Sequence, residues 1–208
     1  MTGRPGRLGE PGERAAGASV AVVRPAEPEE VAAVGRLTTS VYQAAALGDE
    51  QYLEHVGRAD DRALRACLLV AEARDCPAFL LGTITLAVAG GDYADIARPG
   101  EAELRMLAVA PTVAGRGIGR LLVEACHERA AAAGTRRMVC SVEEQNARAL
   151  RFYARLGYTR APDRDWRPIP TVKLLAFTRE LDGDLKASET AGEAPIVRSS
   201  PATTEARL

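Results

Sequence analysis

The feature that most constrains the fold is an apolar segment, 102–109, that runs through a glycine-rich turn into a helical pattern over 117–133. Glycines alternate in the turn at Gly115, Gly117 and Gly119, which leaves its backbone N–H groups without side-chain cover. The first amides of the following helix have no intrahelical acceptors and lie at the positive end of the helix dipole. The segment therefore predicts a cradle for phosphate or pyrophosphate.

Two widespread phosphate-binding motifs do not match this turn. A P-loop requires Gly, four residues, then Gly-Lys-Ser or Gly-Lys-Thr, and a dinucleotide-binding turn requires Gly-x-Gly-x-x-Gly with an acidic ribose anchor further on. The turn has neither spacing. Gly115-Arg116-Gly117-Ile118-Gly119, preceded by Val109-Ala110-Pro111, instead resembles the acyl-CoA pyrophosphate loop of the GCN5-related N-acetyltransferase (GNAT) superfamily.

A second segment resembles the same superfamily. Residues 146–158 are similar to its pattern Asn-x-x-Ala-x-x-Phe-Tyr-x-x-Leu-Gly-Phe/Tyr. Asn146 suits a helix N-cap and Gly157 a C-cap. The residues between them that fall on one helical face are Ala149, Phe152, Tyr153 and Leu156. Two motifs in this order imply a GNAT domain over 20–181.

The ends of the chain differ in composition from the middle. Residues 1–19 are rich in Gly, Arg, Pro and Glu, and residues 182–208 are rich in Ala, Ser, Thr, Glu and Pro. Neither segment offers enough apolar area to order itself, so both are expected to be flexible tails. The chain has 208 residues, 47% of them hydrophobic, which suits one sizeable core and hence one domain over 20–181.

Charge and hydropathy restrict the partners and the location. The 27 basic and 28 acidic residues give a net charge of −1 and aromatic residues are few, so no nucleic-acid partner is expected. No apolar run approaches the roughly 18 residues of a membrane span, and the N-terminus lacks a hydrophobic signal core. We therefore expect a cytoplasmic protein without a membrane partner, and the resemblance allows a homodimer.

Cysteines and histidines favour neither disulfides nor a metal site. The cysteines lack metal-type pairing and occur mostly in apolar patterns, where a buried free thiol is usual, at Cys67, Cys76, Cys126 and Cys140. Two histidines, His55 and His127, are too few for a histidine-built zinc site, and His127 is expected on a helix surface. No metal is expected.

The periodicity predicts an α/β fold with a mixed sheet flanked by helices. The expected strands are 20–23, 64–73, 79–89, 102–109, 137–142, 158–161 and 172–180, and the expected helices are 28–42, 117–133 and the segment that begins at Asn146. Residues 48–61 look less regular, and 90–99 and 163–170 look like loops. The helix 117–133 forms a βαβ crossover and implies a parallel pair. The resemblance implies that this pair is splayed within a mostly antiparallel sheet.

The resemblance also implies acetyl-CoA as the co-substrate. Backbone groups of Leu107 and Val109 would pair with its pantetheine, and N–H groups from about Gly115 to Arg120 would hold the pyrophosphate. The superfamily usually has Arg or Gln where Ala114 stands, so weaker binding is expected, with Arg116 or Arg120 as substitutes. The cofactor-binding residues expected in this way are Leu107, Ala108, Val109, Ala114, Gly115, Arg116, Gly117, Ile118, Gly119, Arg120, Asn146 and Tyr153.

Acyl transfer from a thioester to an amine needs a neutral nitrogen, a donor for the oxyanion and a proton for the departing thiolate. The resemblance makes Tyr153 the general acid and a backbone N–H near Leu107 the oxyanion donor. A core aromatic is the other interpretation of Tyr153. Glu103 stands where some members place a carboxylate that removes an ammonium proton, directly or through water. For Glu103 and its neighbour Glu101, a solvated charge at the start of the strand is the alternative.

The resemblance implies an acceptor pocket against Tyr42, Tyr52 and Trp166, with His55 and residues 163–165 nearby. For Trp166, a tryptophan that covers the sheet edge is the alternative. The identity of the acceptor does not follow from the fold, beyond a primary amine on a small molecule or peptide. The sequence thus predicts an acyltransferase, an acetyl-CoA-dependent N-acetyltransferase that works by direct transfer in a ternary complex. The alternatives are a non-catalytic acyl-CoA-binding sensor and a nucleotide- or phosphate-binding protein.

Overall fold

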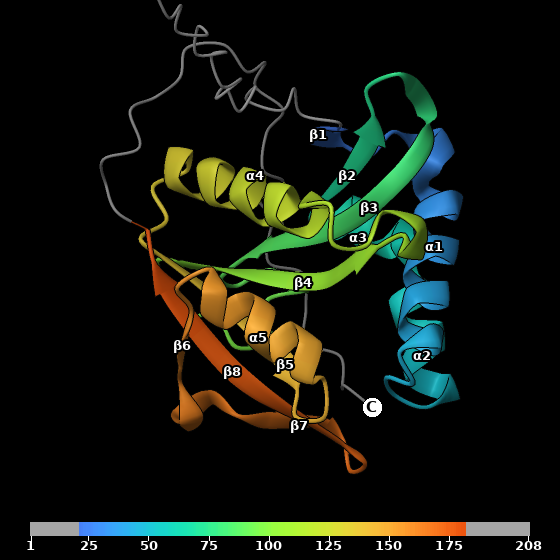
Figure 1. The fold of residues 1–208 in the computed structure, drawn as a ribbon. Helices are drawn as coiled ribbons and strands as arrows, with labels where there is room; N and C mark the ends of the chain where they lie inside the picture. The colour runs from blue at the N-terminus through green and yellow to red at the C-terminus, as the bar shows by residue number, and fades with distance from the viewer. Residues whose placement is uncertain (1–20, 182–208) are drawn as a thin grey trace, which may run out of the picture.

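The structure is a computed structural model that describes residues 21–181, and its centre is one eight-stranded sheet (Figure 1). The strands follow the order β1-β2-β3-β4-β5-β8-β6, with β7 also paired to β8. Their bounds are β1 Ala21–Pro25, β2 Cys67–Ala73, β3 Cys76–Val88, β4 Glu101–Val109, β5 Arg137–Glu143, β6 Thr159–Arg160, β7 Trp166–Ile169 and β8 Val172–Glu180. Only β4 and β5 are parallel, which confirms the mixed, mostly antiparallel sheet. Val20 and the tails expected at 1–19 and 182–208 lie outside the described residues.

Helices cover both faces of the sheet. They are α1 Val31–Ala44, α2 Glu50–Gly57, α3 Ala59–Arg65, α4 Ile118–Ala132 and α5 Ala147–Arg155, with short 3-10 turns η1 Pro28–Glu30, η2 Pro111–Val113 and η3 Pro162–Arg164. The first three lie together on one side of the sheet, and α4 and α5 lie on the other (Figure 1). The largest apolar cluster joins α4 and α5 to the sheet, because Leu122, Cys126 and Tyr153 pack with Leu104 and Cys140.

Two segments are more regular than the sequence pattern indicates. Residues 48–61 were expected to be irregular but contain α2 and the start of α3, and 163–170 contains β7. Asp49 begins α2 as its N-cap, since its side chain accepts the N–H of Tyr52 at 2.9 Å. Both helices last about two turns, too short for a clear 3.6-residue period. β7 is a short strand paired only to β8, a position that tolerates its Pro168.

The parallel strands β4 and β5 are paired over only part of their length. Glu101–Leu104 pairs with Arg137–Cys140, and beyond that point β4 is paired with β3 alone. We call the end of this pairing the β4–β5 fork. A bulge follows at once: the β3 register shifts between Thr83 and Thr85, and Met106 takes a φ of 53°, in the left-handed region. The bulge redirects the last residues of β4, which run into the glycine-rich turn.

His127 is buried, so its expected place on the helix surface is wrong. Its side chain lies on α4 with 5% exposure, and Nε2 is 2.8 Å from the hydroxyl of Tyr158, which follows α5. Their separation of 31 positions along the chain hides this contact from any local pattern. Burial, and then the charge of Arg179, lowers the pKa of His127 from 6.5 to about 4.

This shift predicts an acid-sensitive fold. A histidine kept neutral by folding contributes stability that is complete above pH 6.5 and is lost as the pH falls toward 4, by about 3 kcal/mol. The variant His127→Gln keeps a polar partner for Tyr158 but cannot titrate. Between pH 7.5 and 4.5 its free energy of unfolding should therefore fall by about 3 kcal/mol less than that of the wild type. Urea unfolding at both pH values measures the difference. Equal losses would show that His127 does not carry the acid sensitivity.

Candidate functional site

The glycine-rich turn leaves β4, passes through η2 and enters α4 (Figure 1). Gly115 and Gly117 have φ angles of 82° and 84°, a backbone conformation that favours glycine. A Cβ at either residue would meet nothing within 4 Å, so the space beside both is open. The turn therefore presents bare backbone to its surroundings.

Most amides of this turn have no internal acceptor. Ala114 and Arg116 donate to Pro111 O and Val113 O, each at 3.2 Å, and the first helical bond runs from Leu121 N to Gly117 O at 3.0 Å. The N–H groups that donate to nothing within residues 21–181 are those of Gly115, Gly117, Ile118, Gly119 and Arg120. These groups lie at the positive end of a 15-residue helix, which is a suitable place for an anion. We call this set of amides the cradle.

The side chains around the cradle contribute less than its backbone. Ala114 is exposed and offers no polar group. Arg120 is held on the helix surface by Glu124, with Nε 2.6 Å from Oε1. Arg116 is exposed and forms no ion pair or hydrogen bond through its side chain with the described residues, so it is the cation that remains available to a bound phosphate.

Helix α5 brings Tyr153 toward the fork. Asn146 begins the helix as its N-cap, because Oδ1 accepts the N–H of Ala149 at 3.0 Å, and this confirms the expected cap. Tyr153 is 6% exposed and its ring meets those of Phe152 and Tyr158 edge-on, at 5.1 and 5.3 Å. Its hydroxyl makes no hydrogen bond with the described residues. Burial raises the pKa of Tyr153 well above its ordinary value, so the phenol keeps its proton at neutral pH.

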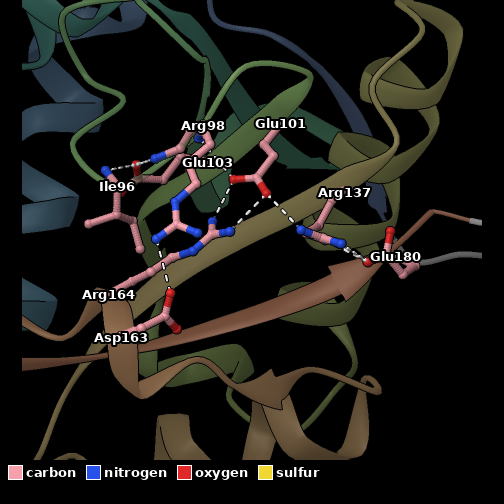
Figure 2. A network of polar contacts seen from close by, with 9 residues as sticks. Ile96, Arg98, Glu101, Glu103, Arg137, Asp163, Arg164 and Glu180 are labelled. Carbon is pink, nitrogen blue, oxygen red and sulfur yellow. Dashed lines mark hydrogen bonds and ion pairs between the residues drawn. The ribbon is translucent and has the colours of Figure 1, made fainter.

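Glu103 is fully buried, so it is not the solvated charge that the sequence left open. Its Oε2 accepts the N–H groups of Ile96 at 2.9 Å and Ala97 at 3.3 Å (Figure 2), which ties the loop before β4 to the strand. Its Oε1 accepts no hydrogen bond and lies 3.6 Å from Nη1 of Arg105. Burial raises the pKa of Glu103 to about 7, although the charge of Arg105 and the two amides oppose the shift.

Glu101 is also buried, but its two oxygens are fully engaged (Figure 2). It accepts two hydrogen bonds from Arg164, at 2.5 and 3.0 Å, one from Arg137 at 3.1 Å and one from the backbone N–H of Arg98 at 2.9 Å. Burial alone would raise the pKa of Glu101, but these bonds, that of Arg164 foremost, lower it below its ordinary value. Glu101 therefore fixes η3, and with it the approach to β7, against the start of β4.

The residues expected around the acceptor come from three separate elements. The ring centroids of Tyr42 on α1 and Tyr52 on α2 are 6.2 Å apart. The ring of His55 lies 6.5 Å from that of Tyr52 and 6.3 Å from that of Tyr93, centroid to centroid. Trp166 on β7 lies on the other side of the fork, where its Nε1 donates to Oγ of Ser141 at 3.0 Å. The structure thus brings Tyr42 and Tyr52 together but does not put Trp166 in contact with them.

Sequence reasoning missed Arg105, which connects these groups. Its guanidinium lies over the Trp166 ring, 5.9 Å from the centroid, and it binds the Asp95 carboxylate and the carbonyl of Tyr93. Its charge also acts on the phenols of Tyr42 and Tyr52. The alternation of Glu101, Glu103 and Arg105 in an otherwise apolar strand is the signal that marks it, because residues two apart share one face of a strand.

Three further observations limit the chemistry of the described residues. Cys126 and Cys140 are free and buried, Cys67 is free and half-buried, and burial raises the pKa of all three thiols. No cluster of three or more His, Cys, Asp or Glu residues suited to a metal is found over 21–181. None of the helices in this range is long and apolar enough to cross a membrane.

A forked parallel pair, a cradle at the start of the crossover helix and a tyrosine beside the fork define an acetyltransferase type of α/β enzyme. A family model described as the acetyltransferase (GNAT) family matches residues 34–158, and the chain belongs to this family. The match spans both motifs, from within α1 to Tyr158. A search of curated proteins finds no match.

Solved structures of the same fold are similar along most of this chain. PaiA N-acetyltransferase from Thermoplasma acidophilum, in complex with coenzyme A, has a TM-score of 0.58 at 16% identity and covers 75% of this chain and 97% of its own. YncA from Salmonella typhimurium, with its cofactor acetyl-CoA, has a TM-score of 0.54 at 20% identity and covers 83% and 100%. A GCN5-related N-acetyltransferase from Kribbella flavida has a TM-score of 0.56 at 23% identity and covers 78% and 98%. These similarities show the fold.

Proposed function

We propose that the protein transfers an acetyl group from acetyl-CoA to a primary amine, directly and within a ternary complex. The observation that carries the proposal is the cradle, five backbone N–H groups without internal acceptors at the start of α4. The cradle follows directly on the β4 backbone beyond the fork, where β5 no longer pairs and the pantetheine would find free hydrogen-bonding groups. The coenzyme A and acetyl-CoA held by PaiA and YncA support this assignment.

The residues beside the fork supply the proton transfers. Attack by the amine nitrogen on the thioester carbon forms the C–N bond, and the C–S bond then breaks. The hydroxyl of Tyr153, protonated and without a hydrogen bond to the described residues, would give its proton to the departing sulfur. A backbone N–H near Leu107, beside the Met106 bulge, would stabilise the oxyanion.

Glu103 is the proposed base, and its burial makes it act through water. Its Oε1 is buried and accepts no hydrogen bond from the described residues, so one water molecule bound there would connect the carboxylate with the reacting amine. The carboxylate must be ionised to accept a proton, and with a pKa of about 7 it reaches that state as the pH rises through neutrality.

This base predicts a particular pH profile. For one acceptor amine, kcat/KM of the wild type should rise as the pH increases toward 7 and then rise less steeply, and Glu103→Gln should remove the change of slope and lower kcat about 10²-fold. Initial rates from pH 5.5 to 9 measure both effects. The matched control is Glu101→Gln, which breaks ion pairs of the neighbouring carboxylate and should keep the profile. A Glu103→Gln enzyme with the wild-type profile would assign the base to another group.

The first test of the proposed function is calorimetric titration with acetyl-CoA, with ATP as the control ligand. Saturable binding of acetyl-CoA alone supports it, and an amine screen that detects the free thiol of CoA completes the test. Binding without turnover of any amine would favour an acyl-CoA sensor, and binding of ATP instead would favour a nucleotide-binding protein. A small-molecule or peptide amine as partner, a cytoplasmic location and a homodimer belong to the same proposal.

A further inference from the structure

We propose that the acceptor is a small zwitterion, an amine with a nearby carboxylate, and that the guanidinium of Arg105 binds this carboxylate. The inference rests on the proposed function and names the substrate class of the same site. It starts from the position of Arg105, the first residue of β4 beyond the last β4–β5 pair. Only the bulge residue Met106 separates it from Leu107, where the thioester carbonyl is proposed to bind.

Arg105 is held rigidly but uses only part of its hydrogen-bonding capacity. Nη1 binds Asp95 and the carbonyl of Tyr93, the latter at 3.3 Å. Nε and Nη2 donate to no described residue, and neither is among the polar atoms that are sealed from solvent without a partner. These two nitrogens form one edge of the guanidinium, which matches a carboxylate through two parallel hydrogen bonds. The side chain is only 10% exposed, so a ligand there would bind out of bulk water.

Arg62 shows that burial alone does not create such a site. Its side chain is fully buried on α3 and donates to Thr38, Val56 O and Thr85, at 3.0 to 3.3 Å. Its remaining Nε is sealed from solvent. Arg62 therefore links α1, α2 and α3 to β3 and is closed to ligands. Arg105, by contrast, has two nitrogens beside the fork that have no partner among the described residues and are not sealed from solvent.

The charges across the fork fit a zwitterion in one orientation. Beyond the last pair, Leu104 with Cys140, the next residues of the two strands are Arg105 and Ser141, and Glu143 is the last residue of β5. Glu143 lies on the same face of β5 as Ser141 and makes no side-chain hydrogen bond or ion pair with the described residues. Its charge acts on both Tyr42 and Tyr52. An ammonium group near Glu143 would therefore lie beside the thioester, while the carboxylate of the same molecule reaches back to Arg105.

The groups around Arg105 do not use up its hydrogen-bonding capacity. Asp95 and Arg105 form a neutral pair. The second carboxylate, Glu103, lies 3.6 Å from Nη1 of Arg105 through Oε1, but its Oε2 accepts the amides of Ile96 and Ala97, which offset part of its charge. The Trp166 face beneath the guanidinium is held by Ser141 and adds a flat apolar surface for the carbon skeleton of the acceptor. A plain amine would leave the open edge of Arg105 unpaired, which costs binding.

The test compares amino acids with their own carboxamides as acceptors, with kcat/KM from release of the CoA thiol. We expect the wild type to prefer the acids by about 30-fold or more, as one buried charged hydrogen-bonding group allows. The double variant Arg105→Gln, Asp95→Asn removes the cation and the charge of Asp95 together. Glu103 also loses its ion pair with Arg105, but this change affects the acid and the carboxamide alike and cancels in their ratio. The double variant should bring the ratio close to one and keep the affinity for acetyl-CoA. A fold defect would lower both rates and leave the ratio unchanged. Arg98→Gln, at an exposed pair with Asp163, is the control and should keep the wild-type preference.

Three results would overturn the proposal that the acceptor is a zwitterion. One is equal or better use of the carboxamides by the wild type, and another is a double variant that keeps the preference for acids. The third is turnover of none of these amines, together with failure of the amino acids to bind the protein saturated with CoA in the calorimeter. Acetyl-CoA binding in that same experiment separates the two proposals, because its loss contradicts the proposed function and its presence confines the failure to the acceptor.

Discussion

Replacing Tyr153 with phenylalanine should lower kcat about 10²- to 10⁴-fold and leave the affinity for acetyl-CoA unchanged. The ring packs edge-on against Phe152 and Tyr158, and phenylalanine preserves these contacts. Only the hydroxyl is lost, and it makes no hydrogen bond with the described residues. Thiol-release kinetics and calorimetry measure the two quantities separately.

The matched control is Tyr158→Phe, which removes a second buried hydroxyl from the same cluster. That hydroxyl lies 2.8 Å from Nε2 of His127, so its loss should lower the free energy of unfolding by about 1 kcal/mol and leave kcat within about twofold. Tyr153→Phe should therefore lower the rate, whereas Tyr158→Phe should lower the stability. A Tyr153→Phe enzyme with normal kcat would make Tyr153 a core aromatic, the alternative that the sequence left open.

The central unit of the fold was predictable because its signals are local. The strand that became β4, the glycine turn, α4 and β5 follow one another, and each is long enough for its own period to show. The short helices after Asp49 and the strand at Trp166 were not predictable in this way. Each depends on a cap or an edge position that the tertiary structure supplies.

The residues of the candidate site also differ in whether local sequence signals predict them. The cradle and Tyr153 lie in contiguous motifs and could be named from them. The environments of Glu103 and Arg105 could not, because the partners that bury them, Asp95 and Trp166 among others, reach them through a loop and a distant strand. The sequence does not distinguish a glutamate on an exposed strand from one buried at the fork. Only the three-dimensional packing around Glu103 shifts the pKa of its carboxyl group.

The backbone of the cradle gives the second large effect, since Gly117→Val should weaken acetyl-CoA binding about 10²-fold or more. A valine there meets no protein atom within 4 Å of its Cβ, so it fills the open space that the proposed pyrophosphate requires. It must also adopt a φ near 84°, which costs roughly 1–2 kcal/mol in an L-residue. Calorimetry with acetyl-CoA measures the first effect, and urea unfolding measures the second.

Gly134→Val separates these two effects. Gly134 has a φ of 79° and a Cβ there also meets nothing within 4 Å, but it follows the other end of α4, about 25 Å from the cradle at 1.5 Å per residue. Both variants should lose similar stability, because both force a β-branched side chain into the left-handed region. Only Gly117→Val should lose acetyl-CoA. If the two proteins bound acetyl-CoA equally well, the five free amides would not be its binding site, since a side chain among them would then obstruct nothing.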